Sequence, residues 1–80
     1  MNIGFDSYIS AGKIKMIYQA DSGKIKKELQ RRKLDKSSPF FCDASSGKEP
    51  KALLLLDDGM LVVSAIAAET LIKRISENSI

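Results

Sequence analysis

The 80-residue chain contains no histidine, no tryptophan, one cysteine and two prolines. Without histidine, the side chain whose ordinary pKa lies nearest neutrality is missing, so a general base would have to be a lysine or carboxylate shifted by burial. A single cysteine excludes an intramolecular disulfide, and a zinc site of the cysteine and histidine kind lacks its ligands. We therefore expect a protein that is not an enzyme, uses no metal or other cofactor and has no small-molecule substrate.

Long apolar runs are missing as well. The longest, Ala52 to Leu56, falls far short of the roughly 20 residues that a membrane-spanning helix needs. The opening residues MNIGFDSYIS have neither the basic nor the apolar region of a secretory signal, and a lone thiol favours a reducing compartment. The sequence thus predicts a cytoplasmic protein with no membrane partner.

The small size of the chain, which we expect to form one domain over residues 1–80, bears on how it is stabilised. At about 1.5 kcal/mol per ordered residue, chain entropy on the order of 120 kcal/mol opposes folding. Chains of this size are often supported by disulfides, a structural metal or self-association, and the first two lack their residues here. We therefore expect a homo-oligomer.

The modest net charge of +3 is unevenly distributed. Residues 1–36 carry nine basic and four acidic side chains, a balance of +5, whereas residues 37–80 carry four basic and six acidic ones, a balance of −2. An oligomer that repeats the positive pole multiplies its field, which favours polyanionic partners. The alternative is an ordinary solvated helix face whose charges only keep the chain in solution.

The first half of the chain predicts two strands and a helix. Apolar residues alternate over residues 2–9 and again over 13–18, where Ile14, Met16 and Tyr18 are expected on one face. Asp21 or Ser22 is placed to cap a helix over residues 24–34, which has a narrow apolar stripe and a wide basic face. Because Ser-Ser-Pro follows, we expect the helix to end over residues 37–39.

The second half predicts three strands and a helix. Residues 40–44 favour a short strand, and residues 51–56 and 60–66 favour two buried strands joined by the Asp57-Asp58-Gly59 turn. Four consecutive leucines suit a strand covered on both faces, and we expect the chain's own helix on one face and a neighbouring subunit on the other. Residues 67–75 have helical spacing, with Lys73 and Arg74 expected in the last turn. The predicted fold class is α+β, a single small domain of order β-β-α-β-β-β-α with an apolar Asp-Gly hairpin near the C-terminus and two amphipathic helices.

Three short motifs invite a chemical interpretation that the residues do not support. Ser45-Ser46-Gly47-Lys48 lacks the upstream glycine, the residue order and the following helix of a phosphate-binding loop. The adjacent carboxylates of Asp57 and Asp58 are explained by turn chemistry rather than cation binding. Cys42 has no histidine partner and lies in an apolar strand, which predicts a buried structural thiol rather than a nucleophile.

Three lysines are better placed for binding. Lys13 lies beside a turn, and Lys48 and Lys51 lie in or next to a loop, where long side chains reach a phosphate backbone without strand packing in the way. Such contacts give salt-dependent affinity and little sequence information. Lys13, Lys48 and Lys51 are therefore the predicted nucleic-acid-binding residues.

The chain also resembles a known family. The shared features are an Asn-Ile-Gly-Phe start, Ser-Ala-Gly-Lys-Ile at residues 10–14, the basic helix, Asp-Ala at 43–44, Gly-Lys at 47–48, Val-Ser-Ala-Ile at 63–66 and Glu-Thr at 69–70. In this order they resemble the extracellular matrix regulatory protein RemA family of bacteria. The resemblance implies a small cytoplasmic DNA-binding regulator that forms a ring-like homo-oligomer and activates genes for biofilm matrix and osmotic response.

The resemblance also implies which residues contact DNA. Family members carry arginine at the positions of Lys13, Lys48 and Glu49, so lysine keeps the charge but not the bidentate fork, and Glu49 reverses it. Lys51 lies two residues from Glu49 and is placed to compensate. Relative to the family pattern, the chain also has three extra residues between the basic helix and Phe41, around residues 37–39. We therefore predict a DNA-binding transcriptional regulator that acts as a higher-order homo-oligomer on double-stranded DNA; the alternative is a structural or protein-interaction oligomer that has lost or weakened DNA binding.

Overall fold

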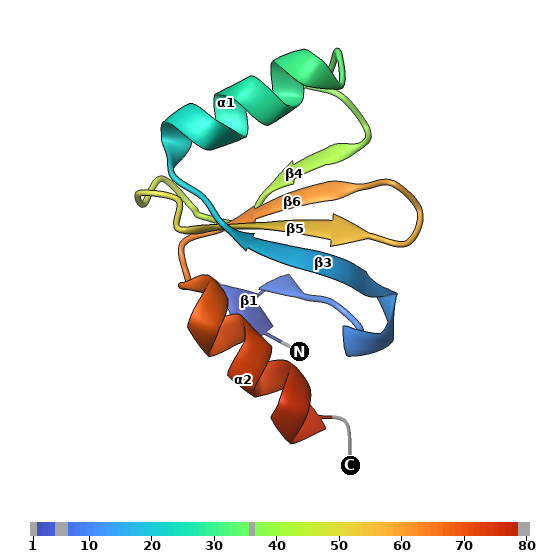
Figure 1. Cartoon of the computed structure of the whole chain (residues 1–80), viewed down its shortest axis with the longest axis vertical. Helices are drawn as coiled ribbons and strands as arrows, with labels where there is room; N and C mark the ends of the chain where they lie inside the picture. The colour runs from blue at the N-terminus through green and yellow to red at the C-terminus, as the bar shows by residue number, and fades with distance from the viewer. Residues whose placement is uncertain (1, 5–6, 36, 79–80) are drawn as a thin grey trace.

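The computed structural model of the chain describes residues 2–4, 7–35 and 37–78. Its centre is a mixed sheet of four strands, β3 (Ile14–Gln19), β4 (Phe41–Asp43), β5 (Ala52–Leu56) and β6 (Leu61–Ser64). The spatial order is β3-β5-β6-β4 (Figure 1). β5 runs antiparallel to both β3 and β6, whereas β4 runs parallel to β6.

The remaining elements lie on the two faces of this sheet. They are β1 (Asn2–Gly4), β2 (Ser7–Tyr8), a 3₁₀ turn over Ala11–Lys13, α1 (Ser22–Arg31) and α2 (Ala68–Asn78). α1 lies over one face, and α2 lies with β1 over the other (Figure 1). The predicted α+β class, its two helices and its Asp-Gly hairpin are confirmed, and the element order is roughly as expected. The first strand is two short strands that pair with each other, and residues 5 and 6 lie outside the described residues.

The hairpin of β5 and β6 forms the core. Every residue of β5 is at most 9% exposed, as four consecutive leucines predict. Leu54 and Leu56 pack with Ile3 and Leu71 on the α2 face, while Leu53 and Leu55 pack with the buried side of α1 on the other. The chain's own helices therefore cover both faces, so no neighbouring subunit is needed to cover the hairpin.

An irregularity in β3 corrects one prediction. The register shifts between Ile14 and Met16, because Ile14 pairs with Leu56 and Met16 with the adjacent Leu55. The extra residue, Lys15, reverses the faces of all that follow. Ile14 therefore packs on the α2 face, whereas the Tyr18 hydroxyl donates to the Met16 sulfur at 3.2 Å on the α1 face. The prediction of one shared face for Ile14, Met16 and Tyr18 was wrong.

The ends of α1 are fixed by local hydrogen bonds. Asp21 caps the N-terminus, its carboxylate accepting from the Lys24 N–H at 2.8 Å, as predicted. At the other end the Leu34 N–H donates to the Leu29 carbonyl at 2.9 Å, and Lys33 adopts a left-handed φ of 57°. This is a Schellman motif, so the helix ends at Arg31, earlier than the following serines and proline predict.

Two predictions for single residues are also corrected. α2 extends to residue 78, and no basic residue lies in its last turn, so Lys73 and Arg74 lie in the middle of the helix instead. Cys42 is exposed on β4, because this strand is an outer strand of the sheet. The expected buried thiol was wrong. Within the described ranges neither helix has the length and apolarity that a membrane crossing requires.

Candidate nucleic-acid interface

The three predicted lysines lie at two different ends of the sheet. The Lys51 N–H donates to the Ser64 carbonyl at 2.9 Å, which fixes Lys51 where β6 ends and β5 begins. The Lys13 carbonyl accepts from the Asp57 N–H at 2.8 Å, beside the turn at the opposite end of β5. Six residues of β3 lie between the two ends, roughly 20 Å at about 3.3 Å per residue. One subunit therefore does not join Lys13 to Lys51 in a single patch.

Lys48 lies at the same end as Lys51, on a short and well-defined turn. The Lys48 N–H donates to the Ser45 carbonyl at 3.1 Å, and the two residues between them have positive φ, 54° at Ser46 and 81° at Gly47. Positive φ at both central positions is typical of a type I′ turn, in which glycine is favoured. The buried Ser45 is fixed by two hydrogen bonds, because the Asp43 carboxylate accepts from both its N–H and its hydroxyl. The turn thus presents Lys48 to solvent from a fixed base.

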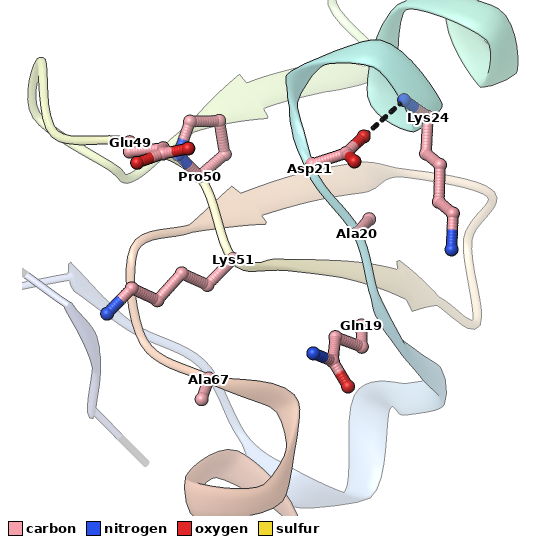
Figure 2. Close-up of a pocket in the computed structure, with 8 residues that line it drawn as sticks. All are labelled: Gln19, Ala20, Asp21, Lys24, Glu49, Pro50, Lys51 and Ala67. Atoms are coloured by element: carbon pink, nitrogen blue, oxygen red, sulfur yellow. Dashed lines mark hydrogen bonds between the residues drawn. The ribbon is translucent and has the colours of Figure 1, made fainter.

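A cavity beside Lys51 has a mixed charge. It has a volume of about 550 Å³ and is bounded by Lys51, Lys24 of α1, Asp21 and Glu49, among other residues. Figure 2 shows the ammonium groups of Lys24 and Lys51 pointing away from each other, with Glu49 on the loop above. Two cations and two carboxylates leave this cavity without a net preference for an anion.

A second cavity, of about 240 Å³, lies beside Lys48. Arg74 of α2 lies on its rim, and one guanidinium N–H donates to the Asn2 carbonyl of β1 at 2.8 Å. Sequence reasoning missed Arg74 as a member of this site, because its partner lies 72 residues away and no local motif marks it. The basic side chains of the cavity are Lys48 and Arg74, and its described lining contains no carboxylate.

The basic face of α1 is partly neutralised by one acid. The Glu28 carboxylate accepts from Arg31 at 2.6 Å and from Arg32 at 2.8 Å. Hydrogen bonds from Arg32 and then Arg31 lower the pKa of Glu28, and the same contact raises the pKa of Arg31. Two of the cations expected to add to the field of this helix are therefore tied to a carboxylate.

Lys13 lies in an acidic neighbourhood. The adjacent hairpin turn carries Asp57 and Asp58, and the Asp58 carboxylate accepts from the Met60 N–H at 3.0 Å. This contact assigns Asp58 to turn formation, as the sequence predicts. Nearby carboxylates weaken the positive potential around a lysine, so Lys13 is less favourable for phosphate than Lys48.

The family of the chain is established by comparison with known proteins. The model of the RemA-like family, described as extracellular matrix regulatory protein A-like, matches residues 1–75. The chain belongs to this family. A relative from Coprothermobacter proteolyticus is 38% identical over 96% of this chain and 70% of its own length. One from Thermosynechococcus vestitus is 36% identical over 95% of each chain, and both are named "Putative regulatory protein".

Membership of the RemA-like family confirms the resemblance found in the sequence and makes the chain a member of a regulatory family. In this RemA-like chain the loop end of the sheet gathers Lys48, Lys51, Lys24 and Arg74. The helix N-termini of α1 and α2 lie at this end as well (Figure 1), and the positive ends of the two helix dipoles add positive potential. Lysine and arginine are donors to phosphate oxygens, but Asp21 and Glu49 lie at the same end and offset part of their charge.

Proposed function

We propose that this RemA-like chain is a cytoplasmic, non-enzymatic DNA-binding transcriptional regulator of the extracellular matrix type, acting as a higher-order homo-oligomer. The observation that carries the proposal is the grouping of Lys48 and Lys51 at one end of the sheet, both exposed. Neither lysine forms an ion pair among the described residues. These exposed lysines and the regulatory character of the family together support the proposal.

In this proposal the chain binds the duplex through phosphate contacts. Each lysine that neutralises a phosphate releases a counterion, so affinity falls steeply as salt is raised. Two or three such contacts from one subunit are weak. A homo-oligomer repeats them along the same duplex, and the linked contacts supply avidity that one subunit lacks.

The distance between Lys13 and the two lysines Lys48 and Lys51 indicates how copies of the chain are arranged in the proposed oligomer. Because one subunit holds these lysines about 20 Å apart, Lys13 joins the same basic surface only if a neighbouring copy is placed beside it. The chain carries exposed apolar side chains suited to contacts between copies: Tyr8, Met16, Phe40 and Ile72. These residues support the homo-oligomer.

The test is binding of a long duplex at two salt concentrations by wild type and four charge-reversal variants. The site variants are Lys13→Glu, Lys48→Glu and Lys51→Glu; Lys73→Glu, exposed on α2 and outside both cavities, is the matched control. We expect steep salt dependence and at least tenfold weaker binding for Lys48→Glu and Lys51→Glu than for the control. Equal binding by all four variants would show that the site is wrong.

One observation favours the alternative function, a structural or protein-interaction oligomer that has lost or weakened DNA binding. Glu49 lies between the two lysines and shares the cavity of Lys51, where its carboxylate repels phosphate. This alternative predicts an intact oligomer by light scattering that shifts no duplex even at low salt. Glu49→Lys discriminates between the two functions, because it should strengthen DNA binding only if the surface already contacts the duplex.

A further inference from the structure

The central sheet ends in two outer strands with open edges. β3 and β4 lie at the two ends of the order β3-β5-β6-β4, and no other described strand pairs with either outward edge (Figure 1). The Ala20 N–H donates to the Lys51 carbonyl at 3.0 Å, so strand alternation turns the backbone groups of Ile17 and Gln19 away from β5. Open edges of this kind pair with a strand of another chain.

An apolar groove of about 470 Å³ lies beside β4, between this strand and α1. Leu34 and Phe41 in this groove are only partly buried, so the chain's own helix does not close this side of the core. The groove adjoins the outward edge of β4, where strand alternation turns the backbone groups of Asp43 away from β6. Its apolar lining comprises Ile25, Leu29, Leu34, Phe41, Pro50 and Val63.

The opposite outer strand carries a side chain that fits this groove. Met16 of β3 is 46% exposed, and the neighbouring Tyr18 hydroxyl donates to its sulfur at 3.2 Å. Because of the register shift in β3, both side chains lie on the α1 face of the sheet, the same face as the groove. An unbranched methionine side chain adapts to an irregular apolar gap. A second copy that adds its β3 to the edge of β4 carries Met16 to this groove.

The two sides of the molecule also differ in charge. On the β3 side, a cavity of about 340 Å³ has three cations and one carboxylate in its lining: Lys24, Lys27, Arg31 and Glu28. On the β4 side, the groove has two carboxylates and one cation: Asp35, Asp43 and Lys26. Contact between two β3 sides, or between two β4 sides, opposes like charges, whereas a β3 side on a β4 side joins opposite ones. The charges favour a contact in which the two copies use different surfaces.

We propose that the groove between α1 and β4 binds the β3 edge of a second copy of this chain, with Met16 in the groove and the two strands paired in one continuous sheet. Because α1 then lies on the same face in both copies, the added β3 runs parallel to β4. Each copy contributes four strands, about 19 Å at about 4.8 Å per strand, so the end that carries Lys48 and Lys51 repeats at that interval. The inference rests on the proposed homo-oligomer, for which it names the interface.

The first experiment measures assembly mass by light scattering for variants altered on one side only. Met16→Glu changes the β3 side and Leu34→Glu the groove, and Thr70→Glu, exposed on α2, is the matched control. We expect both side variants to be monomers at a concentration where wild type and control are assembled. Their equimolar mixture should form a complex of two copies and nothing larger, because one intact groove meets one intact β3 and the other contact opposes two carboxylates.

A second groove variant guards against misfolding. Leu34 is partly buried, so Leu34→Glu is checked by thermal unfolding. Gln30→Glu, exposed on the rim of the groove, adds a negative charge without removing an apolar contact, and it should weaken assembly about threefold.

The second experiment uses Cys42, the only cysteine, which is exposed on β4. Gln19→Cys adds an exposed thiol on β3, and alternation with Tyr18 and Phe41 places both thiols on the α2 face of the sheet. A short bismaleimide should then link residue 19 of one copy to Cys42 of the next and give a ladder of products larger than a dimer. Wild type, with one thiol, gives no ladder, and Thr70→Cys on α2 is the control that should also give none.

The inference is overturned if wild type assembles and both side variants assemble equally well, or if the Gln19→Cys protein is linked only into dimers through Cys42. In those cases the proposed homo-oligomer stands and its interface lies elsewhere. A wild type that is monomeric at all concentrations removes both the homo-oligomer and this interface. Assembly that depends on both sides without any duplex binding refutes the DNA binding of the proposed function and leaves the interface in place.

Discussion

Ser64 is the polar residue whose replacement should cost the most stability. It lies at the end of β6 with 0% exposure, although a serine is usually found at the surface. Its hydroxyl donates to the Ile3 carbonyl of β1 and accepts from the Ile66 N–H at 3.0 Å. One side chain thus links the first strand to the sheet and fixes the chain that leads into α2.

Ser64→Ala leaves both partners without their hydrogen bond and adds no bulk. A buried polar group left unsatisfied costs about 1–3 kcal/mol, so two partly compensated groups should lower the free energy of unfolding by about 2–4 kcal/mol. For a domain of this size each 1 kcal/mol lowers the melting temperature by roughly 4–8 °C. We expect a decrease of about 8–30 °C, a large part of the stability of so small a chain.

Urea and thermal unfolding measure this loss, with Ser10→Ala as the matched control. Ser10 is exposed, and its side chain makes no capping hydrogen bond to the 3₁₀ turn that follows, so alanine should change the free energy of unfolding by less than about 0.5 kcal/mol. Amide exchange should accelerate in β1 and remain slow in β5. A Ser64→Ala protein within 0.5 kcal/mol of wild type would refute the assignment of Ser64 as the link between β1 and the sheet.

Three further predictions concern the helix ends and the glycine beside the small cavity. Glu28→Gln should lower the free energy of unfolding at pH 7 by up to about 1 kcal/mol, since two exposed ion pairs are lost. Hydrogen bonds from Arg32 and Arg31 lower the pKa of Glu28 below its ordinary 4.5, so the difference between the two proteins should shrink as the pH falls below 4.5 and vanish once the pH has passed through the folded value, as urea unfolding over a pH series would show. Lys33→Gly should stabilise the chain by about 1 kcal/mol in urea unfolding, because lysine at φ 57° carries a strain that glycine lacks. Gly4→Ala should lower the free energy of unfolding by about 1–3 kcal/mol, because alanine at φ 128° is strained. Gly12→Ala is the control, since φ at Gly12 is ordinary and thermal stability should change little.

The sequence predicts best those elements whose signals are local. Asp21 marks the start of α1, because an aspartate before a helical run caps the helix by a bond to a backbone N–H three residues later. The Asp-Gly turn that joins β5 to β6 is likewise determined by a few neighbouring residues. The continuous leucines of β5 indicate burial on both faces, but not which elements cover them. The order of helices and strands along the chain is predicted by these local signals taken together.

The features that the sequence does not predict depend on distant partners or on one residue of register. The extra residue Lys15 in β3 reverses the faces of Met16 and Tyr18, and no alternation pattern reveals it. Arg74 has the appearance of a helix-end cation until the Asn2 carbonyl is placed beside it. In the same way the sequence predicts Lys13 and Lys48 as members of one binding site. The pairing of β3 with β5 places them at opposite ends of the sheet.

The parallel pairing of β4 with β6 also has a consequence for the order in which the chain folds. β4 precedes its partner β6 by about 20 residues, whereas β5 and β6 are joined by a tight turn, so we expect the β5 and β6 hairpin to form first and β4 to join its edge afterwards. Its three residues are fixed at the ends by the bonds from Ala44 N–H to Val63 and from Leu61 N–H to Phe40, both 2.8 Å. As a short outer strand added last, β4 should be the first part of the sheet to exchange its amide hydrogens, and it carries the exposed Cys42 thiol. Because this thiol is already exposed in the folded sheet, its labelling requires no opening, and the exchange rate of the β4 amides is the measurement that reports how often the sheet opens from this side.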